Sequence, residues 1–169
     1  MKIFKFGGAS VKDADGVRNI LCVLKHTGFK DTFIVVSAMG KTTNALEKVV
    51  HNYFENKEQF PKKFEAIRSN HHKIIEGLFT EDKVLVTEKI DTLFDMALKF
   101  LSDNTVNNYS LVYDQVVSIG ELASSTIVSY YMRHEDIENT WLDARKCVKT
   151  DTYYRDANLD WEKTKTEIL

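Results

Sequence analysis

The sequence predicts an α/β fold built on a parallel sheet, with a helical insert in the middle of the chain. Two observations predict the sheet. A short strand ends within residues 1–10, and a strongly apolar strand at residues 32–36 follows an amphipathic helix. Two parallel strands joined by a helix form a right-handed βαβ unit. The third observation is a long run of helical periodicity after this unit, which predicts the insert.

The first strand ends in a pair of glycines. Phe4 and Phe6 alternate with Lys5, and aromatic residues favour the pleated surface of a sheet. Gly7 and Gly8 lack a Cβ, so the backbone there can come close to a ligand. A helix opening directly behind them would aim unpaired N–H groups at an anion, and Lys5 adds a full positive charge. These features predict an anion site; the alternative is a tight strand-to-helix turn with an exposed lysine.

The next two elements complete the predicted βαβ unit. Either Ser10 or Asp13 is the expected N-cap of the helix, and Gly28 lies just past its end. Its apolar positions recur at helical spacing: Val17, Ile20, Leu21 and Leu24. Residues 32–36 are continuously apolar and rich in β-branched side chains, which predicts a fully buried parallel strand.

The second strand also ends in small residues, at positions 37–40, and leads into another helix. Asn44 with Glu47 resembles a capping box at the start of that helix. Its expected buried face consists of Leu46, Val49, Val50, Tyr53 and Phe54. Both strand-to-helix junctions lie at the carboxyl edge of one sheet, where ligands bind in open α/β folds.

Three further helices are predicted in the middle of the chain, with charged residues on their solvated faces. Their buried positions are Phe60, Phe64, Ile67, His71, Ile74, Ile75 and Leu78 in the first, Val86, Ile90, Leu93, Ala97 and Leu101 in the second, and Val112, Val116, Ile119, Ala123 and Ile127 in the third, which runs from Leu111 to about Arg133. His71 and His72 are adjacent, so they point in different directions on a helix, and no carboxylate joins them at a ligand spacing. We interpret them as structural or surface histidines rather than metal ligands.

The carboxyl-terminal part predicts a short strand at residues 139–144. A final helix begins near Leu159 and continues to Leu169. An end inside a continuing helical pattern indicates a truncated domain.

Composition excludes several classes of protein. The 169 residues are 43% hydrophobic and 28% charged, which is typical of one globular domain. A net charge of −2 without a basic block argues against nucleic-acid binding. No apolar run approaches the roughly 18 residues of a membrane span, and the opening residues do not resemble a signal peptide. Cys22 and Cys147 are isolated, which is typical of reduced thiols in a cytoplasmic protein.

The common phosphate, dinucleotide, zinc and serine-hydrolase motifs are absent. Three features remain: Lys5 with its glycine pair, residues 37–43, and residues 118–121. Gly120 lies inside a predicted helix, where glycine costs about 1 kcal/mol relative to alanine. It indicates either a close neighbour at the backbone or the presentation of Glu121 to a ligand. The alternative is close helix–sheet packing with a solvated glutamate.

These features together resemble aspartate kinases of the amino acid kinase superfamily. The resemblance lies in Lys-Phe-Gly-Gly-Ala-Ser-Val at residues 5–11, Val-Ser-Ala-Met-Gly-Lys-Thr-Thr-Asn at 36–44, Val-Ser-Ile-Gly-Glu-Leu at 117–122 and Trp-Leu-Asp-Ala-Arg at 141–145. The four stretches follow the family's order and approximate separations along essentially the whole chain. Glutamate 5-kinase, another member of the superfamily, shares the lysine–glycine opening but not this combination.

The resemblance implies transfer of the γ-phosphoryl group of ATP, with Mg²⁺, to the side-chain carboxylate of L-aspartate, giving 4-phospho-L-aspartate. This is the committed step towards lysine, methionine and threonine. The resemblance also implies a role for each matched residue. Lys5 would contact the transferring phosphoryl group, and the ATP phosphates would be bound by Lys5, Phe6, Gly7 and Gly8. The aspartate pocket would be lined by Ser37, Ala38 and Thr43, with Glu121 contacting the amino acid.

The resemblance further implies that residues 1–169 are the amino-terminal, amino-acid-binding part of an αβα sandwich. The nucleotide-binding remainder and the regulatory ACT domains have no match in this chain. We therefore expect little or no kinase activity from the chain alone, and an exposed apolar sheet edge or face that favours a homodimer. A non-catalytic module that binds an amino acid or nucleotide, or serves in assembly, is the alternative. The regulating end product and fusion to a homoserine dehydrogenase stay open.

Overall fold

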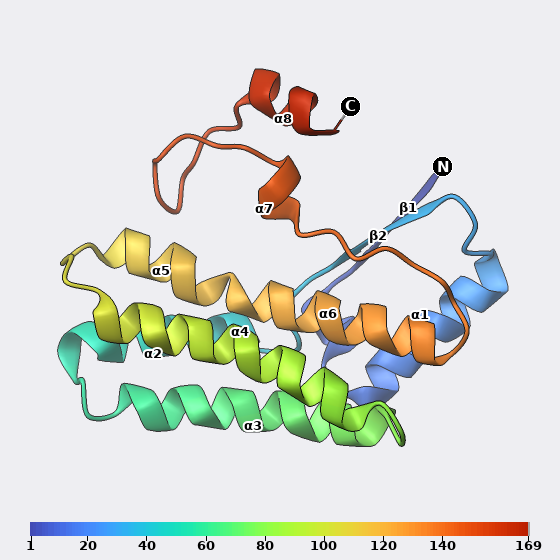
Figure 1. The fold of residues 1–169 in the computed structure, drawn as a ribbon, viewed down its shortest axis with the longest axis horizontal. Coiled ribbons are helices and arrows are strands. Elements are labelled where there is room, and N and C mark those ends of the chain that lie inside the picture. Colours follow the sequence, from blue (N-terminus) through green and yellow to red (C-terminus); the bar gives the residue numbers. More distant parts are fainter. Residues whose placement is uncertain (169) are drawn as a thin grey trace.

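A computed structural model of the chain describes residues 1–168 and confirms a mostly helical α/β architecture (Figure 1). Strands β1 (Lys2–Phe6) and β2 (Thr32–Val36) pair in parallel over their whole length. Between them lie a single 3₁₀ turn, η1 (Gly8–Val11), and helix α1 (Ala14–Thr27). This is the predicted βαβ unit.

The helix that opens at the glycine pair is only the single 3₁₀ turn η1; α1 begins at Ala14, which confirms Asp13 rather than Ser10 as its N-cap. Its N-cap is Asp13, whose carboxylate accepts a hydrogen bond from the Gly16 N–H at 2.9 Å. A capping carboxylate satisfies one of the free donors of the first turn, and that fixes where the helix starts. Gly28 follows α1 with φ +78°, in the left-handed region that glycine favours.

The expectation that β2 is buried on both faces is also wrong. One face of the sheet packs its apolar side chains against the helices, with Phe4 and Phe6 from β1 and their neighbours from β2. On the other face Ile3, Phe33 and Val35 are exposed by 65%, 48% and 42%. We call this the bare sheet face; it consists of Ile3, Lys5, Phe33 and Val35. Among residues 1–168, helices cover one face of the sheet, so the second helical layer of a sandwich is not formed here.

The helical part confirms the predicted insert and most of its buried positions. Phe54, Phe60 and Leu93 are only partly buried, and Phe94, which was not predicted, is fully buried. Its helices are α2 (Thr42–Glu55), α3 (Phe60–Leu78), α4 (Lys83–Asp103), α5 (Tyr109–Val117) and α6 (Ile119–His134). They lie side by side along the long axis of the molecule, with the two strands beside them (Figure 1). The core centres on Phe64 and Phe94, which are fully buried with ring centroids 5.2 Å apart.

Two details of the helical prediction are corrected. The third predicted helix is divided at Ser118 into α5 and α6. The capping box of Asn44 and Glu47 does not form, because α2 begins two residues earlier, at Thr42. The Thr42 side chain is buried, and its hydroxyl donates to the Met39 carbonyl at 2.6 Å. That bond anchors the first turn of α2 ahead of Asn44.

The predicted strand at residues 139–144 is wrong, since these residues are extended but pair with no strand in the described chain. Residues 137–142 run along β2 and α6 with a cavity of about 560 Å³ between them. No backbone hydrogen bond joins these residues to β2 in the described chain. Helices α7 (Ala144–Cys147) and α8 (Trp161–Ile168) follow. The expected final helix is confirmed within two residues of its start, and Leu169 lies outside the described residues.

The two adjacent histidines have separate partners. His71 is buried and its Nδ1 lies 2.8 Å from the Ile67 carbonyl, whereas His72 Nε2 lies 2.8 Å from Asp91 Oδ1 at the surface. This confirms one structural and one surface histidine. Within residues 1–168, no helix combines the length and the apolar character that crossing a membrane requires.

Candidate functional site

Backbone hydrogen bonds join the segments at the carboxyl ends of β1 and β2. The Ser37 N–H donates to the Phe6 carbonyl at 3.0 Å, and the Gly40 N–H donates to the Gly8 carbonyl at 2.9 Å. A Cβ on Gly8 would lie 2.8 Å from the Ala38 oxygen and 2.9 Å from the Gly40 oxygen. No side chain fits there, so Gly8 is required by the contact between the two junctions. The structure thus brings the first two motif stretches into direct contact.

Helix α6 packs against the junction between β2 and α2. A Cβ on Gly120 would lie 3.0 Å from the Ala38 Cβ and 3.2 Å from the Thr42 Cγ2. Four residues on, the buried Ser124 hydroxyl donates to the Ser37 carbonyl at 2.7 Å. The third motif stretch therefore packs on the second, and close packing explains the glycine in this helix.

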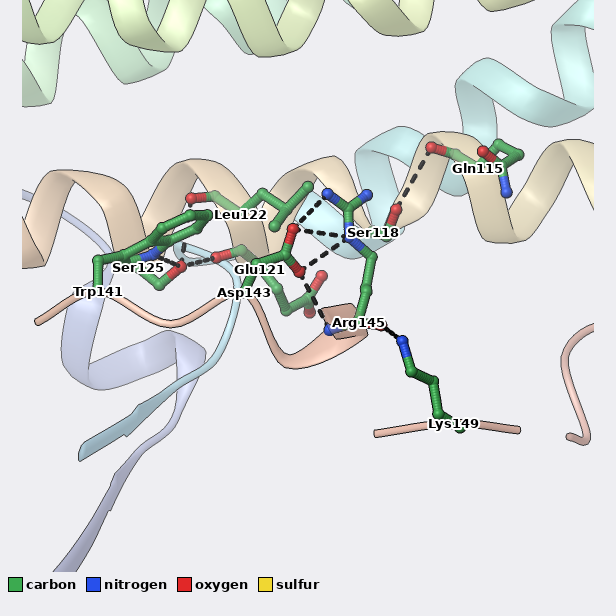
Figure 2. Close-up of polar contacts among 9 residues, drawn as sticks. All are labelled: Gln115, Ser118, Glu121, Leu122, Ser125, Trp141, Asp143, Arg145 and Lys149. Carbon is green, nitrogen blue, oxygen red and sulfur yellow. Dashed lines mark hydrogen bonds and ion pairs between the residues drawn. The ribbon is translucent and has the colours of Figure 1, made fainter. Parts of the chain in front are cut away.

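The fourth motif stretch docks on the first turns of α6 (Figure 2). Trp141 Nε1 donates to the Ser125 hydroxyl at 3.0 Å, and that hydroxyl donates to the Glu121 carbonyl at 2.7 Å. Beside them, Arg145 Nε and Nη2 donate to the two carboxylate oxygens of Asp143, at 2.9 and 2.7 Å. The second and fourth stretches thus contact the start of α6 directly, and the first stretch is joined to it through residues 37–40.

Asp143 is ionised and structural in this arrangement. Hydrogen bonds from the Arg145 side chain lower the pKa of its carboxyl group, against the opposing effect of burial. The same carboxylate accepts the Arg145 N–H at 3.1 Å and so caps α7. Glu121 is half-buried and projects from the first turn of α6 on the side where the chain enters α7 (Figure 2).

Lys5 is exposed on the bare sheet face and reaches forward along it. Its Nζ lies 3.5 Å from where a Cβ on Gly7 would be, so the ammonium group stands directly over the glycine pair. This geometry suits an anion held between the ammonium group and the backbone. The side chain of Phe6 faces the helices, so only its backbone is available at this edge.

The remaining expected site residues differ in how they could meet a ligand. Ala38 is only 2% exposed, so little of either its side chain or its backbone is accessible to a ligand. Ser37 is half-buried, and its carbonyl is used by Ser124. Thr43 is half-buried in the first turn of α2. Among the described residues, no hydrogen bond or ion pair joins the side chains of Lys5, Thr43 and Glu121 to one another.

The sequence reasoning missed the serines of α6 that hold the site together. Ser124 and Ser125 connect this helix to the end of β2 and to Trp141. The available signal was a run of hydroxyl side chains at residues 124–126 on the face of a helix that is otherwise apolar and buried. Hydroxyl groups in such a position need partners, and here those partners belong to the motif stretches.

The side chains that could bind a metal ion are the carboxylate, imidazole and thiol groups of the chain. In the part of the chain that the structure describes, no three His, Cys, Asp or Glu side chains are grouped so that they could hold a metal ion. The site therefore contains ammonium, amide and hydroxyl groups that can donate to an anion. Its carboxylates are not grouped with one another.

Comparison with known proteins agrees with this geometry. A sequence profile described as "Amino acid kinase family" matches residues 1–167. Lysine-sensitive aspartokinase 3 of Escherichia coli (strain K12) is 29% identical over 159 residues, which are 94% of this chain and 34% of that protein.

Two crystal structures of E. coli aspartokinase III are similar in fold. The complex with lysine and aspartate (T-state) matches with a TM-score of 0.85 and 26% identity, over 99% of this chain and 36% of that one. The complex with aspartate and ADP (R-state) matches with a TM-score of 0.83 and 26% identity, over 97% and 36%. The chain spans about a third of the length of these relatives.

Proposed function

The chain belongs to the amino acid kinase family, and from that premise we propose that the whole protein is an aspartate kinase. It transfers the γ-phosphoryl group of MgATP to the side-chain carboxylate of L-aspartate. The observation that carries the proposal is that all four motif stretches are joined by contacts: the first to the second, and the second and fourth to the start of α6. Residues 1–169 then form the amino-terminal, amino-acid-binding part of the catalytic domain.

The chemistry of the reaction fits these residues. The carboxylate of aspartate is already ionised near pH 7, so no general base is needed to produce the nucleophile. The main obstacle is the approach of that anion to a polyanionic phosphate, which positioning and positive charge relieve. Lys5 supplies a mobile ammonium group over the glycine pair, and Gly7 and Gly8 supply backbone N–H groups.

The amino acid is proposed to lie beside α6. The hydroxyl groups of Ser37 and Thr43 line its position, beside the buried Ala38. The Glu121 carboxylate accepts hydrogen bonds from the substrate ammonium group, which is why an acidic residue belongs in a site otherwise suited to anions. The proposal assigns Mg²⁺ to ATP rather than to this chain, since the described residues contain no cluster that could hold it.

The test is the activity of Lys5→Ala in the full-length protein. Removing a charge that stabilises only the transition state should lower kcat by roughly 10²- to 10³-fold. A coupled assay of ADP formation with L-aspartate measures this, and Lys30→Ala, an exposed lysine in the loop before β2, is the control. Undiminished kcat in Lys5→Ala would remove Lys5 from the mechanism.

The same assay separates the proposal from a non-catalytic module. If the full-length protein binds L-aspartate in calorimetry but forms no ADP, the chain belongs to a binding module instead. For the 169-residue chain alone we expect little turnover, because Lys5 stands in open solvent and nothing in the described chain excludes water from the reacting groups.

A further inference from the structure

A second concave surface lies on the flank of the helices, between α2 and α3 and next to the β2–α2 junction. Its volume is about 470 Å³. Four lysines line it, contributed by four different places: Lys12 after η1, Lys41 at the N-cap of α2, Lys48 further along α2, and Lys63 on α3. No aspartate or glutamate is among the lining residues. We call this surface the lysine groove.

The positive charge of the lysine groove is largely uncompensated. Lys12 has one carboxylate nearby, Asp13 Oδ2 at 3.9 Å, and the other oxygen of that group caps α1. The ammonium groups of Lys41, Lys48 and Lys63 make no ion pair or hydrogen bond with any residue of the described chain.

Lysines on a solvated helix face are usually interspersed with acidic residues, as Lys83 is paired with Glu76 here at 3.1 Å. Like charges that converge on a concave surface repel one another and attract counter-ions. An anion in the groove would relieve this repulsion.

The walls between the lysines are apolar or small. Ala45 on α2 and Ala66 and Ile67 on α3 form the sides, and Asn70 adds a neutral polar group. Such a groove suits a compact anion with several charges close together, because each ammonium group is a point charge that pairs with phosphate. The short apolar walls leave room for a small uncharged portion as well.

The lysine groove is separate from the proposed catalytic site, although the two lie close together. Lys5, Gly7, Ser37 and Glu121 do not line it. Its inner end is Gly40, whose N–H donates to the Gly8 carbonyl. The groove and the glycine pair are thus on opposite sides of one hydrogen-bonded contact.

We propose that the lysine groove binds a compact polyphosphate, either inorganic or carried by a nucleotide. The proposal does not depend on the kinase assignment, because it rests on the lysines of α2, α3 and the turn after η1. The ligand pairs with the ammonium groups of the four lysines that line the groove.

The test uses inorganic triphosphate, titrated into the 169-residue chain and followed by calorimetry and by amide chemical shifts. We expect saturable binding with the largest shifts at Gly40, Ala45 and Ile67. The double variant Lys41→Gln/Lys63→Gln should bind about tenfold more weakly, since each exposed charge pair contributes a modest share. Lys30→Ala, at an exposed lysine that does not line the groove, should bind triphosphate as the unaltered chain does. In Lys5→Ala the shifts at Gly40, Ala45 and Ile67 should persist, which separates this site from the catalytic one.

The matched control is the neighbouring lysine of α3. Lys62 is exposed and does not line the groove, so Lys62→Glu should change the affinity less than twofold, whereas Lys63→Glu should weaken it severely. Equal effects of these two variants would show only diffuse attraction to a surface and would overturn the proposal. Absence of binding, or loss of binding in Lys5→Ala with the groove variants unaffected, would overturn it too.

Discussion

Single residues at the ends of the strands determine the shape of the site, either because they lack a side chain or because they add one hydrogen bond. Gly8 has the backbone oxygens of Ala38 and Gly40 within 3 Å of the position where a Cβ would be, and the Gly40 N–H donates to the Gly8 carbonyl, which holds the two segments together. Gly7, its neighbour, has only the flexible end of Lys5 nearby, at 3.5 Å. The two glycines thus have different functions: Gly8 serves packing, and Gly7 leaves space beneath a cation.

The different surroundings of Gly7 and Gly8 predict that substitution by alanine lowers the free energy of unfolding by different amounts at the two positions. Gly8→Ala should lower the free energy of unfolding by about 1–3 kcal/mol, because a Cβ is forced against backbone oxygens. Gly7→Ala should change it by less than about 1 kcal/mol. Urea unfolding of both variants measures this. Equal losses would mean that the contact with residues 38–40 is not what constrains Gly8.

His71 is a second residue whose surroundings determine its behaviour. It is fully buried, and burial lowers its pKa below the usual 6.5. Its Nδ1 lies 2.8 Å from the Ile67 carbonyl, so the neutral form donates there. Its Nε2 has no hydrogen-bond partner in the described chain and is packed near Phe94. A second proton would have to be placed in an apolar core.

This predicts loss of stability in acid. The folded-state pKa is below the unfolded one, so the unfolded chain binds more protons at intermediate pH. The contribution of neutral His71 is fully present above about pH 6.5, and it is lost as the pH falls through the lowered folded-state pKa. Unfolding free energies from pH 7.5 to 5 should fall less steeply in His71→Leu than in the unaltered chain. His51→Gln, at an exposed position of α2, is the control; if His71→Leu kept the full slope, the acid sensitivity would have another source.

At the scale of elements, α6 organises the site. It presents Glu121, packs Gly120 on the β2–α2 junction, and carries the two serines that hold the end of β2 and Trp141. Its sequence is that of a helix buried on most sides, and the hydroxyl groups in it are the contacts to other segments. The start of α2 is likewise set by a tertiary contact, at Thr42, rather than by the local capping signal.

The bond from Ser124 to Ser37 predicts a measurable loss at this scale. Ser124→Ala removes the donor of a buried carbonyl and should lower the free energy of unfolding by about 1–3 kcal/mol. Ser118→Ala removes only a local hydroxyl contact of 3.3 Å to Gln115 and should change it by less than about 0.5 kcal/mol. Urea unfolding compares them, and an unaffected Ser124→Ala would mean that α6 is held by packing alone.

At the scale of the whole molecule, the main feature is the bare sheet face. Apolar side chains from both strands are exposed there, although β1 and β2 have the composition of interior strands. The chain spans about a third of its relatives. We expect the isolated chain to form a homodimer through this face.

Phe33 is the residue on which to test that expectation. Phe33→Lys should shift the chain towards a monomer in sedimentation experiments over a range of concentrations, because it places a charge in the centre of the apolar face. Leu85→Lys, on α4, is a matched control, since the two side chains are exposed by 48% and 46%. A monomer at all concentrations in the unaltered chain would contradict the expectation.

Local signals in the sequence were sufficient to predict the βαβ opening, the helical insert and the four motif stretches. Each is a local signal: alternation in β1, helical periodicity in α3 and α4, an Asp13 cap, or short runs of small residues at strand ends. The resemblance of these stretches to aspartate kinases came from the same local information, and the family match over residues 1–167 agrees with it.

The contacts between residues far apart in the chain are seen only in the tertiary structure. Local patterns do not reveal that Ser124 reaches Ser37, that Gly120 packs on Ala38, or that lysines from four separate places line one groove. The same limit explains the errors. β2 has the composition of a buried strand, yet one of its faces is exposed, and residues 139–144 have no strand beside them at pairing distance. Burial and strand pairing depend on what lies next to a segment in space, and neighbours far apart in the chain leave no mark on its own sequence.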